Sequence, residues 1–167
     1  MVLLVSTVLL VMTQGLTISS RIIGGSINDD PQEVFQAYDK DSSNGWNKEE
    51  FVNYNVETFF FIHDKNEDQK VSMDEWVEAG AQAIQCRGGP DMTADPNFIK
   101  HNEEAFKKTD RDEDGFLDSD EVKDSFERRW ERIGTGNESR EITFDKSELQ
   151  GIIQGNIYAL SCVSGKN

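Results

Sequence analysis

The chain has 167 residues, enough for one compact domain or two small lobes with a hydrophobic core. Its formal net charge of -15, from 17 basic and 32 acidic residues, argues against a nucleic-acid partner, because phosphate backbones are held by Lys and Arg. Ten Phe and three Trp, with 36% hydrophobic residues overall, argue against a disordered chain.

The first segment, residues 1–20, resembles a secretory signal peptide. It contains an uncharged, apolar run from Val2 to Met12. A run of this length is too short to span a hydrocarbon core of about 30 Å as a helix, so a cleaved signal is favoured over an anchor, with a buried structural helix as the alternative. We therefore expect cleavage near 15–20, a secreted, extracellular protein with no membrane span in its mature chain, and a flexible N-terminus over 21–32.

A helical pattern begins at Glu33 and leads into an acidic segment of twelve residues, 39–50, called loop one here. Oxygen-bearing side chains occupy its positions 1, 3, 5, 9 and 12, and apolar Trp46 is at position 8. Asn44 stands at position 6, where the chain must bend sharply, and Asn tolerates the left-handed region better than most residues. The candidate metal ligands are Asp39, Asp41, Ser43, Gly45, Asn47 and Glu50.

The same spacing recurs in loop two, residues 64–75, after an aromatic run (Phe59, Phe60 and Phe61). We expect this run to pack in the core, with the lining of a chromophore cavity as the alternative. Val71 holds position 8. Gln69 holds position 6, where a residue other than Gly costs on the order of 1 kcal/mol. The candidate ligands are Asp64, Asn66, Asp68, Lys70 (through its carbonyl), Ser72 and Glu75.

Residues 86–96 read as a linker that ends in a helix start, with Asp95 as N-cap and Pro96 as the first helical residue. The helix leads into loop three, residues 110–121, with Gly115 at position 6. Ca²⁺ takes 6 to 8 oxygens, and a twelve-residue loop supplies them if it bends at position 6 and ends in a bidentate Glu. The candidate ligands are Asp110, Asp112, Asp114, Phe116 (carbonyl), Asp118 and Glu121.

These loops resemble those of the EF-hand superfamily over about residues 30–155. The resemblance implies an all-α fold of two pairs of helix-loop-helix motifs that bind Ca²⁺. The first pair is expected at 33–85 and the second at 97–157, followed by a C-terminal tail at 158–167. Loop three has five acidic ligands and loops one and two have three each, so we expect the tightest site in loop three.

A fourth twelve-residue segment, residues 137–148, is called loop four here. We expect it to be a vestigial metal-binding loop. Ile142 stands at position 6, where a β-branched side chain makes the bend costly. Its weak ligand set is Asn137, Ser139, Glu141, Asp145 and Glu148. Asn137 also begins an N-glycosylation acceptor sequence, usable in a secreted chain if exposed. A glycan on Asn137 would prevent it from acting as a ligand.

The spacing leaves one question of architecture open. Only 13 residues, Phe51 to His63, separate loops one and two. Either two very short helices meet near Asn53 to Asn55, or one helix serves both loops, which would then lie at its opposite ends and could not pair side by side.

Two cysteines, Cys86 and Cys162, read most simply as one disulfide in a secreted chain, with two unpaired thiols as the alternative. His63 and His101 have no Cys or second His at ligand spacing, which favours solvent-exposed or helix-edge roles over zinc binding or catalysis. No phosphate-binding loop or nucleophile motif occurs, so we expect no enzyme activity.

The sequence thus predicts a secreted, calcium-binding protein that buffers or stores calcium, or belongs to an extracellular, possibly mineralising, matrix. The alternative is a calcium sensor that binds a protein partner through an exposed apolar groove. Such grooves are Met-rich, and only Met73 and Met92 follow the signal. A third reading is a ligand-binding relative similar to the photoproteins or the sarcoplasmic calcium-binding proteins.

Overall fold

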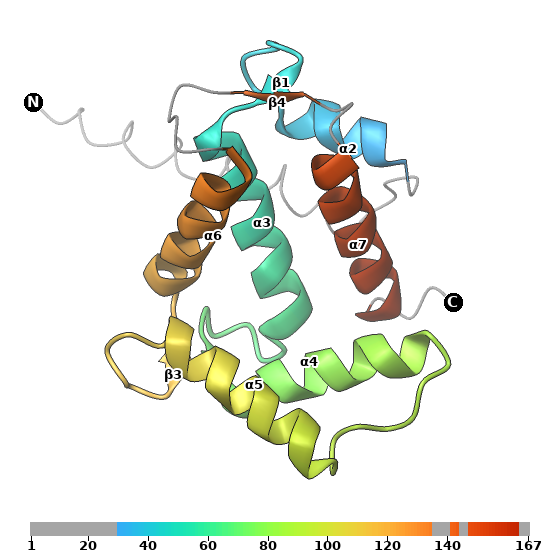
Figure 1. The fold of residues 1–167 in the computed structure, drawn as a ribbon, viewed down its shortest axis with the longest axis vertical. Coiled ribbons are helices and arrows are strands. Elements are labelled where there is room, and N and C mark those ends of the chain that lie inside the picture. The colour runs from blue at the N-terminus through green and yellow to red at the C-terminus, as the bar shows by residue number, and fades with distance from the viewer. Residues whose placement is uncertain (1–29, 135–140, 144–146, 164–167) are drawn as a thin grey trace, which may run out of the picture.

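The computed structural model describes residues 30–134, 141–143 and 147–163. They form a mostly helical fold, as the sequence predicted (Figure 1). The helices are α2 (Pro31–Tyr38), α3 (Lys48–His63), α4 (Met73–Cys86), α5 (Pro96–Thr109), α6 (Ser119–Gly134) and α7 (Ser147–Val163). Two-residue strands lie between them, namely β1 (Gly45–Trp46), β2 (Val71–Ser72), β3 (Phe116–Leu117) and β4 (Ile142–Thr143).

A single helix, α3, joins loops one and two. It runs unbroken for 16 residues, since its sequence contains neither Gly nor Pro, and a capping box between Asn47 and Glu50 closes its first turn. At 1.5 Å per residue the helix is roughly 24 Å long, so the two loops lie at opposite ends of it. The structure thus selects one shared helix over two short ones.

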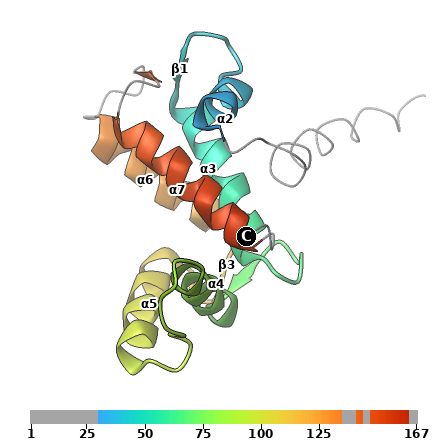
Figure 2. The ribbon, with the colours of Figure 1, turned by 90° about the vertical axis from the view of Figure 1, so that its right-hand side faces the viewer.

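The strands pair between the two halves of the chain. β1 pairs with β4 and β2 pairs with β3, both antiparallel, so loop two lies beside loop three (Figure 1). This differs from the consecutive pairs expected at 33–85 and 97–157. The reason is that α3 and α6 are each a single helix of 16 residues, and each holds the two loops that it connects at its opposite ends. Figure 2 shows α4 and α5 together at one end of the molecule and α2 at the other, while the C-terminal end of α7 contacts α4.

The apolar residue at position 8 of loops one, two and three lies in the core, as does Ile142, which stands at position 6 of loop four. Trp46 pairs with Ile142 and Val71 with Leu117, and the exposed fractions of the four residues are between 0% and 4%. Two clusters of buried side chains surround these pairs. The first includes Phe35, Tyr38, Phe51, Tyr54, Trp130, Leu149 and Ile153, and the second includes Phe106 and Val122. Burying a side chain of this size contributes about 1.5–3 kcal/mol, so the loops are anchored through these residues.

The aromatic run of α3 divides between core and surface. Phe59 and Phe60 pack against the second cluster, as expected, whereas Phe61 is 40% exposed. His63, in the last turn of α3, is not exposed; its ring stacks on those of Phe59 and Trp76, with centroids 4.3 and 5.4 Å away. Burial lowers the pKa of His63 to about 4, so its imidazole is neutral at pH 7.

The predicted disulfide between Cys86 and Cys162 is confirmed. It joins the last residue of α4 to the last turn of α7. Because α7 continues to Val163, residues 158–163 are helical and not part of a tail. At the N-terminal side, α2 begins at Pro31 with Asp30 as its N-cap. The predicted N-cap at Asp95 is confirmed by the hydrogen bonds that its side chain accepts from the first turn of α5.

No helix in the described part of the chain is both long and apolar enough to cross a membrane. The expected signal peptide, residues 1–20, and the acceptor residue Asn137 lie outside the described residues.

Candidate metal centres

Loops one, two and three share one backbone shape. In each, the residues at positions 4 and 6 have φ angles between 58° and 85°, in the left-handed region. Asn44 and Gln69 hold this conformation at position 6 at a cost on the order of 1 kcal/mol each, whereas Gly115 adopts it freely. The left-handed conformation at position 6 was predicted from the sequence, whereas that at position 4 was not. The residues at position 4 are Ser42, Glu67 and Glu113.

The first carboxylate of each loop is held against the bend. In every case the backbone amide of the position-6 residue donates a hydrogen bond to the carboxylate at position 1, an arrangement open to Asp at turns. The distances are 2.9 Å from Asn44 to Asp39, 2.9 Å from Gln69 to Asp64, and 3.1 Å from Gly115 to Asp110. The three loops therefore orient their first candidate ligand in the same way.

The residues at positions 9 and 12 have a second role that the sequence analysis missed. The position-9 side chain accepts a hydrogen bond from the position-12 amide, and the position-12 carboxylate accepts one from the position-9 amide. This is a capping box that begins the next helix, and its spacing was visible in the sequence. The pairs are Asn47 with Glu50, Ser72 with Glu75, and Asp118 with Glu121.

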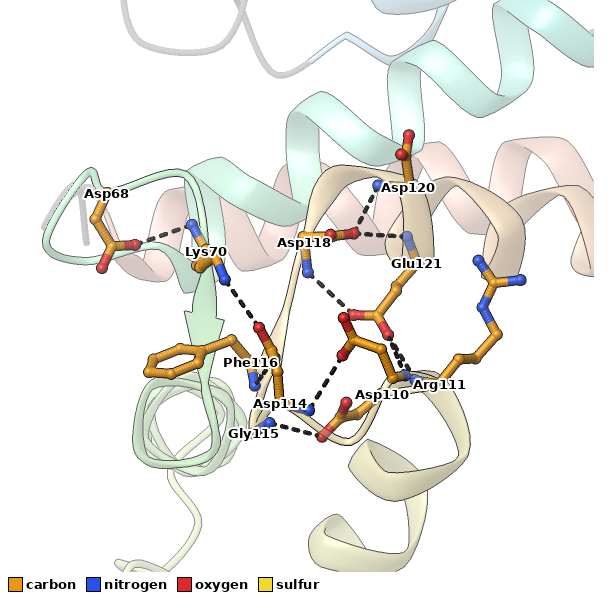
Figure 3. Close-up of polar contacts among 11 residues, drawn as sticks. Asp68, Lys70, Asp110, Arg111, Asp114, Gly115, Phe116, Asp118, Asp120 and Glu121 are labelled. Atoms are coloured by element: carbon orange, nitrogen blue, oxygen red, sulfur yellow. Dashed lines mark hydrogen bonds and ion pairs between the residues drawn. The ribbon is translucent and has the colours of Figure 1, made fainter.

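Loop three brings its acidic side chains together (Figure 3). One oxygen from each of Asp110, Asp112 and Asp114 lies within 4.8 Å of the others. Asp110 and Glu121 are only 8% and 5% exposed. Asp110 Oδ1 is buried without a hydrogen-bond partner, an arrangement that carries a large desolvation cost for a carboxylate. A cation here would supply the missing partner, so the residues of loop three could hold a metal ion.

Loop one forms a second acidic group. Oxygens of Asp39, Asp41 and Glu50 lie within 4.8 Å of one another, and Glu50 is buried. Ser43 Oγ donates a hydrogen bond to the carbonyl of Gly45 at 3.0 Å, which places the candidate ligands of positions 5 and 7 side by side. Hydrogen bonds from the side chain and backbone of Ser43 lower the pKa of Asp41. Loop one could therefore also hold a metal ion.

Loop two draws its polar groups together mainly through hydrogen bonds. The amide of Asp68 donates to Asp64 Oδ1 at 3.1 Å and to Asn66 Oδ1 at 2.9 Å. Glu75 accepts from both the amide and the hydroxyl of Ser72, at 2.9 and 2.8 Å. The acidic groups found in the described residues lie in loops one and three, and loop two contributes none. Its carboxylates are therefore the least converged of the three loops.

Loop four is described only in part. Glu141 and Glu148 are both exposed, in contrast to the buried Glu50 and Glu121 at the last position of loops one and three. The other candidate ligands of loop four, Asn137, Ser139 and Asp145, lie outside the described residues. The exposure of Glu148 agrees with the expectation of a vestigial loop.

Lys70 connects loops two and three. Its ammonium lies 2.9 Å from Asp114 Oδ2 and 5.2 Å from the ring centroid of Phe116 (Figure 3). The hydrogen bond from Lys70, followed by one from the Phe116 amide, lowers the pKa of Asp114. The sequence analysis gave a role only to the carbonyl of Lys70, as a candidate ligand of loop two. Its side chain instead pairs with the position-5 carboxylate of loop three, where it would compete with a bound cation.

Replacing Lys70 with Gln is expected to tighten metal binding at loop three by roughly threefold to tenfold. The substitution removes a competing positive charge near the site, although salt screens the effect because the pair is exposed. Calorimetric calcium titrations of both proteins measure the change. Lys100→Gln, which removes an exposed lysine of α5, should leave the affinity unchanged; an equal effect of both substitutions would refute a specific role for Lys70.

The geometry thus defines a helical protein with short acidic loops between its helices, paired by two-residue strands. Comparison with protein families, curated proteins and solved structures finds no match for the chain.

Proposed function

We propose that this chain is a secreted, non-enzymatic calcium-binding protein of the EF-hand kind, with sites in loops one, two and three. The observation that carries the proposal is the buried, unpaired Oδ1 of Asp110 within the acidic group of loop three. Two further carboxylates lie within 4.8 Å of that of Asp110, and a cation would neutralise their mutual repulsion.

Calcium suits these loops better than other metals because of the donor set. Every candidate ligand offers oxygen, from carboxylates, hydroxyls, side-chain amides or backbone carbonyls, and the three loops contain neither His nor Cys. Hard oxygen donors select calcium or magnesium, whereas zinc and copper prefer nitrogen and sulfur. A ligand set spread over twelve residues and closed by Glu121 suits the larger, more flexible coordination shell of calcium.

The three sites should differ in affinity. Loop three has the most acidic ligands and an unstrained Gly115 at its bend. Loop one has a converged acidic group, but Asn44 stands at its bend in place of Gly. Loop two has neither a converged acidic group nor a Gly at its bend. We therefore order the affinities as loop three, loop one and loop two.

The disulfide supports an extracellular role, since such bonds persist in oxidising compartments. There even sites with dissociation constants of about 10⁻⁴–10⁻³ M are occupied, as in other extracellular modules. Buffering, storage or a place in an acidic or mineralising matrix all agree with a net charge of -15.

Calorimetric titration of calcium into the mature, metal-stripped protein tests this proposal, with an uncharged hydrophobic dye added in parallel. We expect binding at three sites without a rise in dye fluorescence. A strong rise would instead favour the sensor function, in which calcium exposes an apolar groove. The absence of calcium binding would contradict both functions.

A further inference from the structure

A cavity of about 380 Å³ lies between α3, α4, α5 and α6. Its volume falls within the roughly 300–1,000 Å³ typical of small-molecule sites. Trp76, which directly follows loop two, and Phe126 of α6 form part of its wall. The cavity is separate from the acidic groups of the loops, whose carboxylates do not line it.

The walls of this cavity are aromatic. Phe59 lies at the centre, with its ring centroid 5.7 Å from that of Trp76 and 6.3 Å from that of Phe126. All three rings are only partly buried, so they present apolar surface to the cavity. An apolar body can therefore be enclosed on several sides, and burial there contributes roughly 25 cal/mol per Å² of apolar surface.

The rim of the cavity is basic. Arg129 and Arg132 of α6 both line it and reach solvent. Neither forms an ion pair with any carboxylate in the described residues, whereas Arg111 and Arg128 both pair with Asp124. Two arginines three positions apart on one helix, without acidic partners among the residues that the structure describes, stand out in a chain with a net charge of -15. The pair provides a site of positive potential directly beside an apolar cavity.

Glu148 is an acidic residue close to this arrangement. It lines a neighbouring hollow of about 430 Å³ together with the same two arginines, yet forms no ion pair with either of them. The guanidinium groups therefore remain available to a ligand, and planar guanidinium binds carboxylates through paired hydrogen bonds.

We propose that this cavity binds a small organic acid that has an apolar, ring-containing body and a single carboxylate. The body lies against Phe59, Trp76 and Phe126, and the carboxylate contacts Arg129 and Arg132 at the rim. This binding site is distinct from the acidic groups of the calcium loops.

The test uses 4-phenylbutanoate as probe and 4-phenyl-1-butanol as its uncharged analogue, titrated calorimetrically into the full mature protein. A ligand of this size is expected to bind with a dissociation constant of about 0.1–1 mM. Arg129→Gln combined with Arg132→Gln should weaken binding of the acid about tenfold and leave binding of the alcohol unchanged. Arg128→Gln is the matched control, because Arg128 lies on the same helix but pairs with Asp124.

Tryptophan fluorescence then locates the site. Trp46 and Trp130 are 0% and 1% exposed, so a change on binding is expected from Trp76. Trp76→Phe should abolish the fluorescence change while the heat of binding persists. The proposal is overturned if the acid does not bind at 5 mM, roughly fivefold above the weakest affinity expected. It is also overturned if Arg128→Gln weakens binding as much as the double variant, or if the fluorescence change survives in Trp76→Phe.

Discussion

Glu121→Gln is expected to lower the calcium affinity of loop three by at least about 100-fold. Glu121 is buried, and its carboxylate is the proposed bidentate ligand at position 12. Removing a charged partner from a buried site costs about 3 kcal/mol or more, which corresponds to roughly 100-fold in affinity. Calorimetry would show the tightest of the three binding events disappear.

The fold should survive this substitution. Glu121 also accepts a hydrogen bond from the amide of Asp118 in the capping box of α6, and Gln can do the same. A second variant, Glu113→Gln, is the control for charge alone, because Glu113 is an exposed residue of the same loop at a position that offers no ligand. An affinity loss as large in Glu113→Gln as in Glu121→Gln would contradict the ligand assignment.

Replacing both Cys86 and Cys162 with Ser is expected to destabilise the protein by about 2–4 kcal/mol. The bond closes a long loop, with a sequence separation of 76, and thereby restricts the unfolded chain. The melting temperature should fall by roughly 5–15 °C for a protein of this size, as measured by circular dichroism in the presence of calcium.

Chemical reduction provides an internal control for this prediction. The chain contains only these two cysteines, so a reducing agent should lower the melting temperature of the native protein as much as the double substitution does. The same agent should have no effect on the double variant. An unchanged melting temperature in both cases would show that the bond between α4 and α7 contributes nothing to stability.

Much of each loop could be predicted because its chemistry is local. The bend at position 6, the buried residue at position 8 and the cap at Asp95 all follow from residues a few positions apart. Trp46 and Leu117 are apolar residues in otherwise acidic segments, and such residues go to the core.

The strand pairing could not be predicted in the same way. It depends on whether 13 residues between two loops form one helix or two, and both arrangements satisfy the spacing. The continuous α3 decides this, and with it the pairing of β2 with β3. Contacts that follow from the pairing, such as that of Lys70 with Asp114, were equally inaccessible, because the two residues are 44 positions apart.

The cavity depends on packing from several helices. Phe59, Trp76 and Phe126 come from α3, α4 and α6. The sequence analysis favoured core packing over a cavity for the run that contains Phe59, on the general rule that aromatic residues fill the core. The basic rim was likewise hidden, since Arg129 and Arg132 belong to a charged helix that also carries Arg128, which is paired with Asp124.

Counting the bound ions by native mass spectrometry tests the central claim most directly. The mature protein would first be equilibrated with calcium at about 1 mM, near the weakest affinities expected for extracellular sites. The proposed function predicts three calcium ions per chain. At the lower calcium concentration that just fills loop three of the native protein, it predicts that Glu121→Gln loses that ion. A native protein without bound calcium, or a count at that lower concentration that Glu121→Gln leaves unchanged, would contradict it.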